Sequence, residues 1–397
     1  MFPRFRYPSG DPPLGLCYIA TAAIGQGHDV QIVDATWHPS EGWIERQLAG
    51  SDLVGVYVNT LALAEANRII DWCMGQGIRT VGGGPHATVR PADVHGSSWR
   101  GEGEPLFGRS GLDNLDDYGH PSLHLVDMGR YTKAWHYLDH LSPRLTGANI
   151  VASRGCPFDC TYCQPTLRQL FGKKVRYHSP VWVSQEVNRL QDTYKVDGVF
   201  FHDDTFTARR DWVFEVCERL QPLNILWGCN ARADTLDIEI CAKMWQAGCR
   251  NVHLGIECAS DRVRNEVYRK RISTKQIQEA IHACQLAGIA VMGFFMLGAP
   301  TETKEEMEET IELACELPLT EATFSITSPL PGSHLGDSGV AGWGGRDYYG
   351  TDATPALRGL QRKALIKFYL RHAGYIARHL TSWRGLERLV RKIGRFR

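Results

Sequence analysis

The stretch SRGCPFDCTYC, residues 153–163, follows an apolar run and places Cys156, Cys160 and Cys163 on one loop with the spacing C-x3-C-x2-C. Three thiolates can hold three irons of a four-iron cluster and leave the fourth iron open to a chelating ligand. A structural zinc site is the alternative, but it needs a fourth protein ligand, and the candidate nearby is His178. The spacing favours a [4Fe-4S] cluster, with the three cysteines as its metal-binding and catalytic residues.

The sequence around and after this loop repeats a pattern of one strand followed by one helix up to Gly332. Apolar runs typical of buried strands alternate with amphipathic segments. Six such units predict an incomplete parallel barrel, and such barrels place their chemistry at the carboxyl ends of the strands. The strands are expected around Ile150, Val199, Ile225, Val252, Val291 and Phe324.

The first 110 residues alternate helical and extended stretches, as in a doubly wound, Rossmann-like parallel sheet. We expect helices over residues 14–24 and 63–74, and strands over 28–34, 53–58 and 79–82. The polar, glycine-rich segment that follows is typical of a linker. The overall prediction is an α/β protein: a truncated Rossmann-like domain over 1–110, a linker over 111–147, a partial (βα)6 barrel over 148–332, and a short helical C-terminal region over 333–397, with a helix over 355–380.

Composition excludes several classes of protein. Lys plus Arg and Asp plus Glu both number 44, so the chain lacks the bulk positive charge on which non-specific nucleic-acid binding depends. No stretch has the ~20 apolar residues of a membrane-spanning helix, and the N-terminus lacks the apolar core of a signal peptide. We therefore expect a soluble, cytoplasmic protein. Its remaining cysteines are predicted to be small buried residues, namely Cys17, Cys73, Cys217, Cys229, Cys241, Cys249, Cys258, Cys284 and Cys315.

Beyond the cysteine triplet, the chain resembles the radical S-adenosylmethionine (SAM) enzymes that carry an N-terminal cobalamin-binding domain. The barrel half of this resemblance rests on FFHDDTFT (200–207), NARAD (230–234), HLGIECAS (253–260), GFFMLGAPTET (293–303) and SPLPGS (328–333). Family membership implies that SAM binds the open iron and is cleaved reductively to methionine and a 5'-deoxyadenosyl radical. The cofactor supplies the radical, and the protein positions it.

The resemblance and the sequence pattern together suggest a SAM pocket. Asp203 and Asp204 follow an apolar strand and could accept hydrogen bonds from the methionyl ammonium, with helix capping as the alternative. Arg232 could pair with the methionyl carboxylate, or form a surface ion pair instead. Glu257 lies in an apolar run, so we expect a polar ligand or a buried basic partner.

Three further residues of the SAM pocket are implied mainly by the resemblance. Met296 and Gly298 end a hydrophobic strand that in the family lines the adenine, although ordinary core packing explains such residues equally well. Tyr162 would offer its backbone to the adenine.

The N-terminal half resembles the cobalamin-binding domain at PPLGL (12–16), GHDVQIVD (27–34), DLVGVYVNT (52–60), VGGGPHAT (81–88) and RGEGE (100–104). Two departures leave open an incomplete sheet without cobalamin: a central strand expected before PPLGL is missing, and the segment after GEGE is short. We interpret His86 as a hydrogen-bonding loop residue rather than a cobalt ligand. The candidate cobalamin contacts are Asn59, Thr60, Gly83, Gly84, His86, Gly101 and Glu102.

These features predict a cobalamin-dependent radical SAM enzyme that methylates an unactivated carbon of a small molecule. Oxidative cyclisation or rearrangement without methyl transfer is the alternative, and a non-catalytic metal or corrinoid carrier fits the SAM-pocket stretches less well. Expected partners are the substrate and an electron donor such as flavodoxin or ferredoxin, with no nucleic acid. The basic tail over 384–397 is expected to be a solvated helix, with peripheral membrane contact as the alternative.

Overall fold

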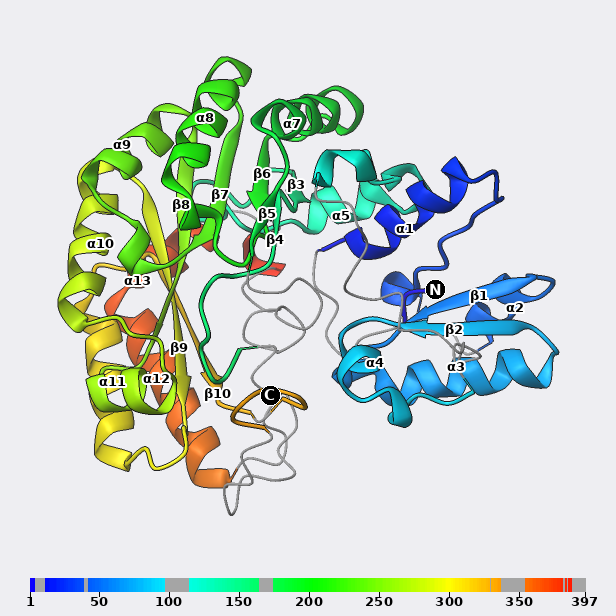
Figure 1. Ribbon diagram of the computed structural model, residues 1–397. Coiled ribbons are helices and arrows are strands. Elements are labelled where there is room, and N and C mark those ends of the chain that lie inside the picture. The colour runs from blue at the N-terminus through cyan, green and yellow to red at the C-terminus, as the bar shows by residue number, and fades with distance from the viewer. Residues whose placement is uncertain are drawn as a thin grey trace.

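The computed structural model describes residues 1–3, 11–38, 42–96, 114–163, 174–328, 330–336, 354–380, 383 and 385–387. A large curved parallel sheet, covered by helices on its outer side, lies beside a smaller α/β unit (Figure 1). The α/β class and the two-part architecture are as predicted.

The large sheet is the partial barrel. Its six strands are parallel and adjacent in the order β10-β9-β8-β7-β6-β3, so each strand pairs with the previous barrel strand of the chain. Strands covered on both faces can be apolar throughout, and every residue of β3 and β6 is buried. All six predicted strands are confirmed: β3 (Gly147–Ile150), β6 (Gly198–Phe201), β7 (Leu226–Ala231), β8 (Cys249–Glu257), β9 (Ala290–Leu297) and β10 (Glu321–Ile326).

The connecting helices bury one stripe against the outside of the barrel. In α7, for example, Val183, Val187 and Leu190 are fully buried at helical spacing. A short antiparallel pair, β4 (Ser153–Arg154) with β5 (Arg176–Tyr177), precedes the first of these helices. The barrel helices are α7 (Pro180–Tyr194), α8 (Arg210–Leu220), α9 (Ile238–Gln246), α10 (Thr274–Ala287) and α11 (Lys304–Glu316), with a π-helical turn at Val263–Val267.

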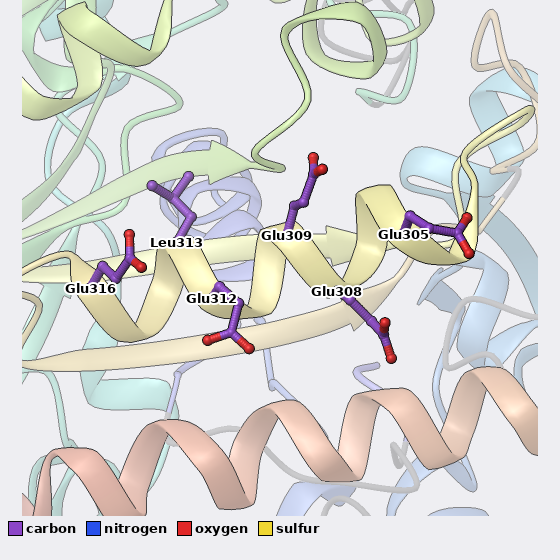
Figure 2. Close-up of a pocket in the computed structure, with 6 residues that line it drawn as sticks. All are labelled: Glu305, Glu308, Glu309, Glu312, Leu313 and Glu316. Carbon is purple, nitrogen blue, oxygen red and sulfur yellow. The ribbon is translucent and has the colours of Figure 1, made fainter.

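The predicted C-terminal helix is present but broken at His372 into α12 (Pro355–Arg371) and α13 (Ala373–His379). Helix α12 packs on the barrel through the buried residues Leu357, Ala364 and Phe368. Figure 2 shows a hollow along the acidic face of α11, where Glu308 points toward α12. Acidic residues of α11 pair there with lysines of α12, in contacts that are partly exposed and therefore weak. Apolar packing is what holds α12 in place.

The smaller unit has two paired parallel strands, β1 (Leu53–Tyr57) and β2 (Arg79–Gly83). Its helices are α2 (Trp43–Leu48), α3 (Leu63–Gly75) and α4 (Pro85–Val89), whereas α1 (Leu14–Gly25) packs on the core of the barrel. These elements confirm the strands predicted near residues 53 and 79 and the helices predicted over 14–24 and 63–74. Short 3-10 turns occur at Ala35–Trp37, Thr60–Ala62, Pro91–Asp93, Leu115–Tyr118, Leu123–Leu125, Phe206–Ala208, Gln221–Leu223 and Ala233–Thr235.

The strand predicted over residues 28–34 was wrong. Among the described residues, only a single parallel bridge forms there, between Phe2 and Asp34. The N-terminal residues lie between this segment and β1: the Phe2 amide donates to Val33 O at 2.9 Å, and the Tyr57 amide donates to Met1 O at 3.0 Å. The sheet position expected to lack a central strand is thus held by residues 1–2.

The segment expected to be a linker packs against the barrel. Its helix α5 (Met128–Ala134) and the residues after it bury Tyr131, Trp135 and Leu138 almost completely. Helix α1 also packs here: the Ser122 amide donates to Cys17 O at 3.2 Å, and Cys17 belongs to the barrel's hydrophobic core. Residues 114–146 therefore contribute to the folded core beside the barrel.

Candidate functional site

The cysteine loop lies at the carboxyl edge of the barrel, just after β3 and β4. Cys156 Sγ is 3.7 Å from Thr205 Oγ1, and Cys160 Sγ is 3.6 Å from the Arg232 guanidinium. Thr205 follows β6 and Arg232 follows β7, so the loop is in contact with two strand ends. Cys163 is exposed.

The three thiols fit an iron–sulfur cluster by donor type and spacing. In the described part of the chain, no three His, Cys, Asp or Glu side chains gather closely enough to hold a metal ion, so the thiols do not converge to ligand distances here. His178, the alternative zinc ligand, is buried and has its Nδ1 3.0 Å from Asp116 Oδ1. The remaining nine cysteines are buried, as predicted.

Asp203 supports the turn that leads into the cysteine loop. Its carboxylate accepts hydrogen bonds from the Ala152 amide at 3.1 Å and from the Ser153 hydroxyl. Burial raises its pKa from 3.8 to about 6. The pKa of the neighbouring Asp204 also rises to about 6, because of desolvation and the proximity of Asp203. Asp204 is the exposed member of the pair.

Arg232 is bound on several sides. Its guanidinium forms a forked pair with Asp234, at 3.0 Å to each carboxylate oxygen, and donates to Lys270 O at 2.9 Å. It also lies over the Phe158 ring, 3.5 Å from the centroid. The alternative of a surface ion pair does not hold, since Arg232 is only 6% exposed and its ion pair with Asp234 is partly buried. Its guanidinium links the end of β7 to the cysteine loop.

Glu257 has a buried basic partner, and that partner is a lysine. Lys270 Nζ lies 2.5 Å from Glu257 Oε1, and the Tyr162 hydroxyl donates to the same oxygen at 2.9 Å. Both charged side chains are at least nine-tenths buried. Lys270 was not identified from the sequence, because it stands in the basic run RKR, which is typical of an exposed turn. The structure therefore joins Tyr162 and Glu257, two of the predicted pocket residues.

Met296 and Tyr162 pack against one small apolar cluster that also contains Tyr268 and Cys258. The backbone turns at Gly298, where φ is +81°, and the Gly298 amide donates to Glu302 Oε2 at 2.6 Å. Burial raises the pKa of Glu302 to about 7. Sequence reasoning missed Glu302, for which the only signal was a carboxylate four residues after the glycine.

Three candidate cobalamin residues, Asn59, Thr60 and His86, form hydrogen bonds within the protein. Asn59 Oδ1 accepts from the Ala62 amide at 2.9 Å, and Thr60 Oγ1 lies 3.0 Å from His86 Nδ1. The second ring nitrogen of His86 is 3.1 Å from Asp93 Oδ2. The histidine is 3% exposed, so the arrangement favours the hydrogen-bonding reading over cobalt ligation.

The candidate glycines Gly83 and Gly84 lie at the carboxyl end of β2. Gly83 ends β2, and Gly84 adopts φ +120°, where a Cβ would lie 2.7 Å from Val58 O. Gly84 is thus needed for the turn to pack on Val58. Gly101 and Glu102 lie outside the described residues.

The N-terminal unit reaches the barrel mouth through Asp11, which sequence reasoning also missed. Its carboxylate accepts from Tyr137 Oη at 2.8 Å and from Asn149 Nδ2 at 2.5 Å, and lies 3.6 Å from His202 Nε2. His202 directly follows β6. In addition, the Tyr18 ring of α1 lies under Arg154, which directly precedes the cysteine loop, at 5.3 Å. Asp11 and helix α1 are therefore in contact with the carboxyl edge of the barrel.

Two family models match this chain. The radical SAM superfamily matches residues 150–314, and the B12 binding domain matches residues 9–108. Within the described residues, no helix has both the length and the hydropathy needed to cross a membrane.

Three curated relatives illustrate the range of similar proteins. An uncharacterized methyltransferase of Pyrococcus horikoshii is 30% identical, over 91% of this chain and 88% of the relative. The cytidylyl-2-hydroxyethylphosphonate methyltransferase of Streptomyces wedmorensis is 29% identical, over 63% of this chain and 52% of the relative. An anaerobic magnesium-protoporphyrin IX monomethyl ester cyclase of Rubrivivax gelatinosus is 28% identical, over 82% and 65%.

Solved structures share the fold at lower identity. The radical SAM methyltransferase TsrM from Kitasatospora setae, solved with cobalamin and a [4Fe-4S] cluster, matches with a TM-score of 0.66 at 18% identity, over 82% of this chain and 74% of that chain. The cobalamin-dependent radical SAM enzyme OxsB matches with a TM-score of 0.60 at 16% identity, over 81% and 52%.

Proposed function

This chain belongs to the radical SAM superfamily, among the members with a B12-binding domain, and from that premise we propose that it is a cobalamin-dependent methyltransferase acting on carbon. The substrate is a small molecule with an unactivated carbon. Methyltransferases among the similar proteins support this choice.

One observation carries the proposal: Asp11 and Tyr18, which lie in the segment that matches the B12 binding domain, are in contact with the residues around the cysteine loop. Asp11 binds Tyr137 and Asn149, and Tyr18 lies against Arg154. The sulfonium methyl of SAM is an electrophile, so a carbon radical needs another methyl source close by. A corrinoid-binding domain next to the barrel mouth meets that requirement.

The residues of the barrel mouth then have the following proposed roles. When bound, the cluster and SAM supply the adenosyl radical and cobalamin supplies the methyl group. Cys156, Cys160 and Cys163 hold the cluster, and the exposed Asp204 accepts hydrogen bonds from the SAM ammonium. Glu257 keeps one oxygen, Oε2, that accepts no hydrogen bond from any described residue, and we assign it to SAM.

The other pocket residues act at the edges of the SAM site. Arg232 pairs with the methionyl carboxylate from its place beside Cys160, while Asp203 acts mainly by fixing the turn before the loop. Tyr162, Met296 and Gly298 line the adenine. The residues that would contact the corrin are Asn59, Thr60, Gly83, Gly84, His86, Gly101 and Glu102, and His86 would do so without ligating cobalt, since both of its ring nitrogens have partners.

We further propose that the enzyme works in the cytoplasm with flavodoxin or ferredoxin as its electron donor, and without a nucleic-acid partner. Contact of the basic tail with a membrane surface stays an alternative to solvation. Oxidative cyclisation remains the second candidate reaction, and similarity to the cyclase of Rubrivivax gelatinosus favours it.

Methyl-deuterated SAM tests this function. Holoenzyme reconstituted with cobalamin is incubated anaerobically with an extract of small metabolites, and the labelled products are identified by mass spectrometry. A product with the intact labelled methyl group, together with S-adenosylhomocysteine and 5'-deoxyadenosine in about equal amounts, is expected because the cofactors supply both chemistries. An altered but unlabelled product without S-adenosylhomocysteine would establish cyclisation or rearrangement instead. The triple variant with alanine at the three loop cysteines is the control.

A further inference from the structure

The cysteine loop is held by a second segment, residues 267–271, which lies beyond β8 and contains none of the predicted site residues. The Thr161 amide donates to Tyr268 O at 3.0 Å, and its hydroxyl donates to Val267 O at 2.6 Å. Asp159 lies 3.6 Å from Arg271. These contacts hold the loop on either side of Cys160.

Lys270 forms the innermost of these contacts. Its Nζ lies 2.5 Å from Glu257 Oε1 and 3.3 Å from the hydroxyl of Tyr162, the residue between two of the cysteines. Its backbone carbonyl accepts a hydrogen bond from the Arg232 guanidinium, which also lies 3.6 Å from Cys160 Sγ. One residue is thus connected to the loop twice, through its side chain and through its main chain.

The backbone around the Lys270–Glu257 ion pair leaves room for it and adopts unusual conformations. A Cβ at Gly255 would lie 2.5 Å from both Glu257 Oε1 and Lys270 Nζ, so the pair fits only across a glycine. Glu257 has φ +71° at an irregularity in the pairing of β8 with β9, and the residues on either side of Lys270, Arg269 and Arg271, have φ +50° and +58°. Such conformations cost free energy in non-glycine residues and persist where the surrounding structure imposes them.

We propose that Lys270 is a positioning residue for the cluster: it fixes Glu257 and Tyr162 and thereby holds the cysteine loop in the form that binds iron. Lys270 acts through these side chains and does not itself ligate iron. Because Lys270 occupies Oε1 of Glu257, it also leaves Oε2 for the role proposed above. The inference rests on the cluster of the proposed function, but not on methyl transfer.

Iron retention tests this inference without a substrate. Anaerobically reconstituted proteins are mixed with the chelator bathophenanthroline disulfonate, and iron release is followed by absorbance. Lys270→Met should release iron about tenfold faster than the parent, since a hydrogen-bonded charged contact is lost. The double variant Lys270→Met/Glu257→Gln should release iron at about the same rate as Lys270→Met, because both substitutions remove the same contact. Lys275→Met, at an exposed lysine of α10, is the matched control.

The outcomes separate the possibilities. Release from Lys270→Met at the parental rate overturns the proposal, and so does a double variant that releases iron about tenfold faster than Lys270→Met, because Lys270 and Glu257 would then act independently. If Lys270→Met does not fold, Tyr162→Phe carries the test: it keeps both charges and must still release iron faster than the parent, and a parental rate overturns the proposal. A failure of methyl transfer alone would leave these iron measurements unchanged.

Discussion

Replacing Asp203 by asparagine should remove a specific part of the pH dependence of stability. The Asp203 carboxyl is 1% exposed and burial raises its pKa from 3.8 to about 6. One pKa unit corresponds to about 1.4 kcal/mol, so ionising Asp203 costs the folded state about 3 kcal/mol. Below the unfolded pKa this cost is absent, because the group is protonated in both states. As the pH rises toward the folded pKa, the unfolded chain loses its proton first, so the free energy of unfolding falls.

About half of this loss, ~1.5 kcal/mol, falls between about pH 5 and about pH 8. We expect the parent to lose that much more stability over this interval than Asp203→Asn. Asparagine can still accept one of the two hydrogen bonds, so at the acidic end the variant should be less stable by about 1 kcal/mol. Urea unfolding of the apoprotein, followed by circular dichroism at both pH values, measures both effects.

The comparison of parent and variant cancels the contribution of other buried groups that titrate in this range, such as Glu302, to the pH dependence of stability. The exposed Asp192→Asn is the control and should follow the parent. If Asp203→Asn lost as much stability as the parent between the two pH values, the reasoning from burial would be refuted.

Three further results are expected. Alanine at Cys156, Cys160 or Cys163 should abolish the four-iron cluster, because each supplies one thiolate; a triple alanine variant with full iron content by chemical analysis would contradict this. Asp204→Ala should keep the cluster but weaken SAM binding by ~1.5 to 3 kcal/mol, as for a lost hydrogen bond to a charged group, and unchanged affinity in equilibrium dialysis would move the pocket elsewhere. The protein should retain hydroxocobalamin through gel filtration, and His86→Ala should leave the cobalt spectrum unchanged; a spectral change on that substitution would instead identify His86 as a cobalt ligand.

The barrel could be predicted from the sequence because its strands are continuous apolar runs separated by amphipathic helices. The information is local, and all six strands were found. The strand prediction near residue 34 was wrong because it depended on non-local information. The sequence there resembles a strand, but a strand needs a pairing partner, and the bridge partner of Asp34 is Phe2, which is distant in the chain.

The site was predictable in part. Cysteine spacing identified the loop, and the apolar surroundings of Glu257 indicated a buried basic partner. Which partner it is could not be read from the chain, because the burial of Lys270 depends on a turn with two residues at positive φ and on a glycine across from it. Asp11 was missed for a similar reason, since its contacts come from residues more than a hundred positions away.

Because nine cysteines are buried, the number of thiols that react in the native protein can be used to measure cluster content. Each of these residues is no more than 7% exposed, whereas Cys156 and Cys160 are partly exposed and Cys163 is exposed. A maleimide or disulfide reagent applied to the native protein under anaerobic conditions should therefore label only the loop, and iron should protect it. The number of thiols labelled per chain then reports directly how much of a preparation carries the cluster, before any activity is measured.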